Sequence, residues 1–261
     1  MSKPSFKQKI NFMVDFTKND FKKRYLGSYL GIIWAFVQPL ISILLFWFVF
    51  QVGFRSTPIN DVPFILWLSC AIIPWNFIAD SLQSSTSAVL ENSFLVKKVV
   101  FKLEILPIVK VCSALIVHLF FLAFLVVMFL VYGYEFSIYY LQTIYYLIAS
   151  IFLVLGVSWI TSSIVLFLKD TAQIVAMLLQ FGFWLTPIFY PLKMIPERFQ
   201  FFFKLNPAYY ITNGYRNAFI YKQWFWQNPT QTIYFWIITL LMCFIGFKLF
   251  KKLQPHFADV I

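Results

Sequence analysis

The chain has 261 residues, of which 61% are hydrophobic and 12% are charged, and its mean hydropathy is +0.78. This composition excludes a soluble protein and predicts an integral membrane protein. The net charge of +11 does not indicate nucleic acid, because the basic residues lie at the ends of apolar segments, where anionic lipid headgroups are the expected partners. The three cysteines stand in apolar runs without metal-ligand spacing, so no metal site is predicted.

Residues 1–28 are predicted to form an amphipathic helix that lies in the membrane surface. Apolar side chains recur there at roughly helical spacing, with basic residues on the other faces. A disordered basic leader is the alternative. The segment is polar and basic without a compact apolar core, so we expect no cleavable signal peptide.

Long uncharged stretches follow, and each reaches or approaches the ~20 residues that a membrane-spanning helix needs. Counting from one charge to the next predicts six transmembrane helices, at 29–54, 62–89, 105–134, 138–168, 171–190 and 229–252. Most of the basic residues lie on one side of this arrangement, which predicts that both termini are cytoplasmic. We see no repeat or separate soluble domain, so residues 1–261 are predicted to form one all-α membrane domain.

The turn between the second and third predicted spans has an amphipathic pattern. Phe94 and Phe101 form an aromatic stripe, and Lys97, Lys98 and Lys102 form a basic face. The pattern predicts a short cytoplasmic helix over 91–103, which could insert into a groove on a soluble partner. A loop that extends its lysines to the lipid headgroups is the alternative.

Residues 191–224 combine prolines with many aromatic residues. The segment is too apolar to lie free in water and too broken for a single span, and such backbone is tolerated at membrane depth only where protein or a water-filled cavity covers it. It therefore predicts a re-entrant extracytoplasmic hairpin, with a kinked connector as the alternative. Asn206 before Pro207 is typical of a helix N-cap followed by an N1 proline.

No motif for covalent chemistry is present in the sequence. A phosphate-cradling glycine-rich loop is missing, so the chain is not expected to hydrolyse ATP by itself. Asp80 and His118 are the only conceivable pair of ionisable residues for a proton-coupled carrier, and we interpret each as a helix-contact residue instead. We therefore predict no cofactor and no metal in this chain.

The order of these features resembles the transmembrane subunit of type-2 ABC exporters, in the branch that exports lipid-linked polysaccharide such as O-antigen, capsule or teichoic acid. The resemblance covers most of the chain. Its motifs are NDFKKRYLGSYLGIIWAFVQPL (19–40), PWNF (74–77), ENSFLVKKVVFKLEILP (91–107), LKDTAQIV (168–175), TPIFYP (186–191) and LNPAYYITNGYRNAF (205–219). One departure is Lys102 after Phe101, where the family often has a proline.

The resemblance implies a homodimer that works with two copies of a separate ABC nucleotide-binding subunit, which would hold ATP and magnesium. It also implies the bacterial cytoplasmic membrane as the location. The implied contact with the ATPase consists of Glu91, Asn92, Lys97 and Lys98. Lys22, Lys23 and Arg24 would attract the diphosphate of a polyprenyl-linked glycan. The implied gate residues are Asn206, Pro207, Tyr210 and Arg216.

Aromatic residues on the first and fifth spans are candidates for the wall of a glycan channel. A sugar ring has a face of C–H groups that can lie against an aromatic ring without a fixed hydrogen-bond register. The candidates are Trp34, Phe46, Phe50, Phe181, Trp184 and Tyr190. An aromatic stripe that faces lipid or a neighbouring helix is the alternative.

The predicted function is therefore that of a permease subunit that exports lipid-linked polysaccharide and performs no covalent chemistry. A type-2 ABC exporter of lipid or drug is one alternative. An intramembrane enzyme that acts on polyprenyl lipids is another, and it would require a cluster of acidic or histidine residues near the headgroups, which the sequence does not contain.

Overall fold

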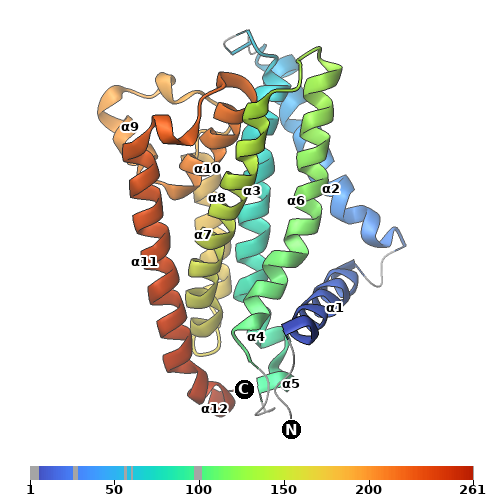
Figure 1. Cartoon of the computed structure of the whole chain (residues 1–261), viewed down its shortest axis with the longest axis vertical. Helices are drawn as coiled ribbons and strands as arrows, with labels where there is room; N and C mark the ends of the chain where they lie inside the picture. Colours follow the sequence, from blue (N-terminus) through green and yellow to red (C-terminus); the bar gives the residue numbers. More distant parts are fainter. Residues whose placement is uncertain (1–5, 26–28, 56–57, 60, 97–101, 261) are drawn as a thin grey trace.

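The computed structural model describes residues 6–25, 29–55, 58–59, 61–96 and 102–260. Within these residues the regular structure is helical, apart from one isolated bridge between Ile59 and Val62. The helices form an elongated bundle, with one helix, α1 (Phe6–Tyr25), lying at an angle beside one end (Figure 1).

Five helical segments of the described chain are long and apolar enough to cross a membrane. They are the segment Gly31–Gly53, which contains α2 (Trp34–Trp47), then α3 (Phe64–Thr86), α6 (Ile105–Val131), the segment Ile138–Ile164, which contains α7 (Gln142–Ile164), and the segment Pro229–Val260, which contains α11 (Pro229–Leu253) and α12 (Phe257–Val260). The structure is thus that of a multi-pass helical membrane protein.

The segment predicted as the fifth of six spans forms a shorter helix. Helix α8 (Thr171–Leu185) has 15 residues, which at 1.5 Å per residue give about 22 Å, less than the ~30 Å of a hydrocarbon core. The helix ends because Thr186 precedes Pro187 and adopts an extended conformation, with φ −91° and ψ 124°. Residues 186–191 then continue without regular helix.

Helix α3 lies at the centre of the bundle and packs against α2, α6, α7 and α8 (Figure 1). Small polar residues in its second half make close contacts possible: the Ser85 hydroxyl donates to the carbonyl oxygen of Pro107 at 3.3 Å, and Thr86 donates to Thr161 at 2.9 Å. Ser81 is fully buried as well. The small hydroxyl residues after Asp80 thus face neighbouring helices rather than lipid.

Helices α7 and α11 approach each other through two glycines. A Cβ atom at Gly156 would lie 2.7 Å from the backbone nitrogen of Cys243, and one at Gly246 would collide with the carbonyl oxygen of Gly156. No larger residue fits at this crossing without separating the helices, as is common where membrane helices pack closely.

The predicted hairpin between α8 and α11 contains two helices, α9 (Glu197–Lys204) and α10 (Pro207–Arg216). Helix α10 is largely buried and packs against α3, α7 and α11, whereas α9 lies at the edge of the bundle (Figure 1). Two short helices, α4 (Ala88–Glu91) and α5 (Ser93–Val96), lie at the opposite end, together with α12. The hairpin and the α4–α5 turn therefore mark the two ends of the molecule.

Candidate functional site

The first residues of α10 are held by a local cap and a link to α8. The Asn206 side chain accepts a hydrogen bond from the backbone N–H of Ala208 at 3.0 Å, and Pro207 occupies the first turn. The Asn206 amide also donates to the Thr186 hydroxyl at 2.9 Å. The predicted N-cap and N1 proline are therefore present, and the cap also connects α10 to the segment after α8.

The last residue of α10, Arg216, is 3% exposed and binds backbone rather than a carboxylate. Its guanidinium donates to the carbonyl oxygens of Pro187 at 2.7 Å, Ile188 at 2.8 Å and Trp67 at 3.4 Å. It also lies 3.4 Å from the centroid of the Trp67 ring. Burial lowers the pKa of Arg216 to about 10, so the guanidinium is still charged at neutral pH. Arg216 thus joins α10, α3 and the segment after α8.

The middle of α10 contacts the other two neighbours. The Tyr210 hydroxyl lies 2.9 Å from that of Tyr145 on α7 and 3.0 Å from that of Thr232 on α11. The ring of Tyr146 packs directly on Gly214, leaving no room for a Cβ atom. Sequence reasoning missed Tyr145, Tyr146 and Gly214. Only the glycine inside a helix gave a signal of close packing.

The six aromatic residues predicted to line a channel have different surroundings. Phe46 and Phe50 pack on Phe189, with ring centroids 4.6 and 5.3 Å apart, and Phe46 also contacts Phe183. The Tyr190 hydroxyl donates to the carbonyl oxygen of Trp184 at 2.6 Å.

The remaining candidates are more exposed. Trp34, Phe181 and Trp184 have 41%, 59% and 54% of their surface exposed, and Trp34 lies at a cavity lined in part by Arg24. A role of these aromatic residues in a channel stays a prediction. Phe183 and Phe189 pack with Phe46 but were not singled out in the sequence.

Of the three cations predicted to meet a lipid headgroup, Arg24 has a defined partner. Its guanidinium binds both carboxylate oxygens of Asp80 on α3, with Nη1 donating to Oδ2 at 2.9 Å and Nη2 donating to Oδ1. Lys22 and Lys23 are exposed on the last turn of α1. Asp80 is therefore paired with Arg24 rather than with His118.

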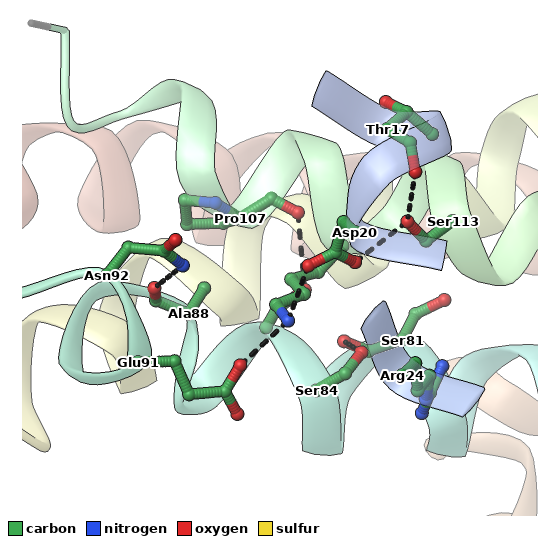
Figure 2. A network of polar contacts seen from close by, with 12 residues as sticks. Thr17, Asp20, Arg24, Ser81, Ser84, Ala88, Glu91, Asn92, Pro107 and Ser113 are labelled. Carbon is green, nitrogen blue, oxygen red and sulfur yellow. Dashed lines mark hydrogen bonds and ion pairs between the residues drawn. The ribbon is translucent and has the colours of Figure 1, made fainter. Parts of the chain in front are cut away.

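A second charged group joins α1 to the α4–α5 end of the bundle. Lys110 on α6 lies 2.7 Å from Asp20 and 2.8 Å from Glu91. The Ser113 hydroxyl lies 2.8 Å from the other oxygen of Asp20, which can accept its hydrogen bond. The Lys110 and Asp20 side chains are 12% and 14% exposed, and Glu91 is 53% exposed. Figure 2 shows this polar junction.

A single coupling helix is predicted over 91–103. In the described residues, α4 ends at the start of this range and α5 lies within it. Helix α4 ends at Glu91, and Asn92 interrupts the helix with φ −113° and ψ 32° before α5 begins. The Asn92 amide donates to the carbonyl oxygen of Ala88 at 2.8 Å. Lys97 and Lys98 lie outside the described residues, so a single coupling helix and its contact with a partner stay predictions.

The described residues contain no group of three or more His, Cys, Asp or Glu side chains that could hold a metal ion. The ionisable residues described above instead connect helices, as Arg216, the Arg24–Asp80 pair and the Lys110–Asp20 pair do. A bundle of apolar spans with a buried hairpin at one end and a charged junction at the other defines a multi-pass integral membrane protein.

Comparison with known families agrees with this class. The sequence model described as "ABC-2 type transporter" matches residues 16–220, so the chain belongs to the ABC-2 type transporter family. It is a transport subunit rather than an enzyme, and membership of this family implies that it pairs with an ABC ATPase subunit.

Three curated relatives align over nearly the whole chain. Two proteins of Klebsiella pneumoniae named O-antigen export system permease protein RfbA are 28% and 27% identical over 252 residues, covering 96% of this chain and 95% of each relative. A Myxococcus xanthus protein with the same name is 24% identical over 251 residues, covering 95% of both chains.

Proposed function

We propose that this chain is the permease subunit of an ATP-driven exporter that moves a lipid-linked polysaccharide of the O-antigen type across the bacterial cytoplasmic membrane. The observation that carries the proposal is the end-to-end similarity to three permeases named for O-antigen export. The buried helix α10 is the proposed gate at one end of the molecule, and the charged junction beside α4 lies at the opposite end, where the ATPase is proposed to bind.

The proposed topology has six crossings with both termini in the cytoplasm. The fifth crossing consists of α8 and the segment 186–191, which Arg216 holds against α10. The hairpin between α8 and α11 then faces the exterior, and α4, α5 and α12 face the cytoplasm. Two copies of the chain form the passage, because the spans carry too few polar residues to enclose one within a single copy.

The proposed energy source is a pair of nucleotide-binding subunits, which hold ATP and magnesium and contact the turn after α4. Glu91 is 53% exposed beside this turn and shares Lys110 with Asp20 of α1. A displacement of the turn by the ATPase would therefore act directly on α1 and on the cations near its end.

Transport itself is tested in vesicles. We expect inverted membrane vesicles that contain the chain and its ATPase to move a lipid-linked polysaccharide into the vesicle only when ATP is present. The moved glycan becomes protected from an added glycosidase. A vesicle without this chain is the control. Export of a phospholipid or a drug in place of the glycan would support the alternative exporter, and a lipid modified by the purified chain alone would support the enzyme.

Reversing two charges in the coupling turn is expected to separate the permease from its ATPase. In the double variant Lys97→Glu/Lys98→Glu, the amount of ATPase that copurifies with the chain should fall more than tenfold, because like charges across an interface cost several kcal/mol and each ~1.4 kcal/mol is a factor of ten. The matched control is Lys22→Glu/Lys23→Glu, which reverses the same number of charges at the end of α1. The control should retain the ATPase and reduce glycan export. Equal copurification in both variants would contradict the proposed contact.

A further inference from the structure

A cavity of about 390 Å³ lies between α2, α3 and α6, on the side of the bundle next to α1. Its walls are formed by residues within 34–42 of α2, 73–80 of α3 and 114–121 of α6. At 1.5 Å per residue these stretches extend over about 10 to 12 Å along the helices. Helix α2 diverges from α6 toward the end of the bundle at which α1 lies (Figure 1). The volume is at the lower end of the range for small-molecule sites, ~300 to 1,000 Å³.

The deepest polar group of this cavity has an unused hydrogen-bonding atom. His118 is 3% exposed, and its Nε2 lies 2.9 Å from the hydroxyl of Tyr215. Among the described residues, its Nδ1 has no hydrogen-bond partner. A buried polar atom without a partner is costly, and an ionisable side chain within a span marks a functional site by default. This nitrogen is therefore available to a polar ligand group that enters the cavity.

Two amides line the same cavity. Gln38 comes from α2 and Asn76 from α3, and both carry donors and acceptors that a hydroxyl group can use. Ser42, one turn after Gln38, donates to the carbonyl oxygen of Gln38 at 3.1 Å and also faces the cavity. An acyl chain would gain nothing from these groups, whereas a sugar could bond to several of them at once.

The end of the cavity near α1 is bounded by a charge pair and an indole ring. Arg24 and Asp80 both line the cavity, and their side chains are 31% and 38% exposed. A diphosphate carries more charge than one carboxylate and also offers two oxygens that a guanidinium can bind in a bidentate manner, so it can compete with Asp80 for Arg24. Trp34, which is 41% exposed, adds an aromatic face of the kind that suits a sugar ring.

We infer that this cavity binds the lipid end of the exported glycan, namely the first sugar and the phosphate to which it is joined. The phosphate takes the place of Asp80 on Arg24, the sugar ring lies against Trp34, and its hydroxyls bond to His118 Nδ1 and Asn76. The inference rests on the proposed function, because it assumes an anionic glycolipid as substrate. It means that the permease reads the phosphate-linked sugar rather than the polymer that follows.

Equilibrium binding of two labelled lipids tests the inference on the full chain with its ATPase in lipid nanodiscs. One probe is a polyprenyl diphosphate that carries a single hexose, and the other is the same polyprenyl diphosphate without sugar. Asn76→Leu and His118→Phe should each weaken binding of the sugar-bearing probe about tenfold, the loss expected for one or two hydrogen bonds. Binding of the bare diphosphate should change less than about twofold, because these residues do not touch the phosphate. Arg24→Gln should weaken binding of both probes.

The matched control is Ser158→Ala, which alters another buried polar side chain without a described partner but lies outside the cavity. It should bind both probes as the unaltered chain does. Unaltered affinity of the Asn76 and His118 variants for the sugar-bearing probe would overturn the inference, while binding and export by the unaltered chain would leave the proposed function standing. Full displacement of that probe by phosphatidylglycerol would also overturn it, because the site would then hold an ordinary phospholipid. Failure of the unaltered chain to bind either probe would contradict both proposals.

Discussion

Replacement of Arg216 with methionine is expected to abolish export and to destabilise the protein strongly. The change leaves the carbonyl oxygens of Pro187, Ile188 and Trp67 without their shared donor in a buried position. Hydrogen bonds to a charged group contribute about 1.5 to 3 kcal/mol each, so the two short bonds to Pro187 and Ile188 alone correspond to a loss of about 3 to 6 kcal/mol. A loss of this size is comparable to the whole stability of many domains, which is ~5 to 15 kcal/mol. The measurement is the apparent Tm of the solubilised protein together with glycan export.

Two further variants show whether the guanidinium itself is required. Arg216→Lys keeps the charge but cannot donate in a fork to two adjacent carbonyls, so its Tm and export should be intermediate. Arg198→Met is the control, because Arg198 lies exposed on α9 of the same hairpin and should tolerate the change. If Arg216→Met retained the Tm and export of the unaltered chain, the segment after α8 would not depend on Arg216.

Replacement of Lys110 with methionine is expected to release α1 from the bundle and to uncouple ATP hydrolysis from export. Asp20 would keep its charge at 14% exposure without the lysine with which it pairs, and removal of one partner from a buried pair costs about 3 to 5 kcal/mol. Glu91 contributes less, because it is half exposed and water screens its charge. The release of α1 can be measured by the yield of a disulfide between cysteines introduced on α1 and α6, and the uncoupling by the glycan exported per ATP hydrolysed.

A second substitution should reverse much of this defect. In Asp20→Asn/Lys110→Met the unpaired buried charge is removed, so the double variant should be more stable than Lys110→Met alone. This non-additivity is what a double-mutant cycle measures for residues in direct contact. Additive losses of stability would show that Asp20 and Lys110 act independently, contrary to the described ion pair.

The helical character and the apolar spans could be predicted because long uncharged stretches have few alternatives in a membrane. The end of α8 was harder to predict from the count of charges alone. Residues 186–190 are as uncharged as those before them, yet the backbone leaves the helix at Thr186 because a proline follows. The steric effect of Pro187 on Thr186 therefore sets where this helix ends, whereas the hydropathy of the segment predicts only that a helix is present.

The aromatic candidates on the first span could also have been separated by their spacing. Phe46 is 12 residues after Trp34, which at ~100° per residue places it about 120° around the helix. The structure accordingly has Phe46 beside Phe189, and Trp34 at the cavity with Arg24. Aromatic content alone did not distinguish these two faces.

Partners that are distant in the sequence could not be read from it. The N-cap at Asn206 is a local pattern, so its residue types predicted it. Arg216 instead binds the backbone carbonyls of Trp67, Pro187 and Ile188. Every residue carries such a carbonyl, so no sequence motif marks these three as its partners. The pairing of Asp80 with Arg24 rather than His118 likewise depends on where α1 lies, which the sequence does not specify.

The junction between α1 and the rest of the molecule also sets an order for biogenesis. Asp20 and Ser113 are 93 residues apart in the chain, so a ribosome adding ~5 to 20 residues per second needs about 5 to 20 s to reach the second after the first. Throughout that interval the first helix lacks its ion-pair partner. A nascent chain that stops before Lys110 cannot complete the Asp20 contact, so the N-terminal helix docks only after the span containing Lys110 and Ser113 has been translated.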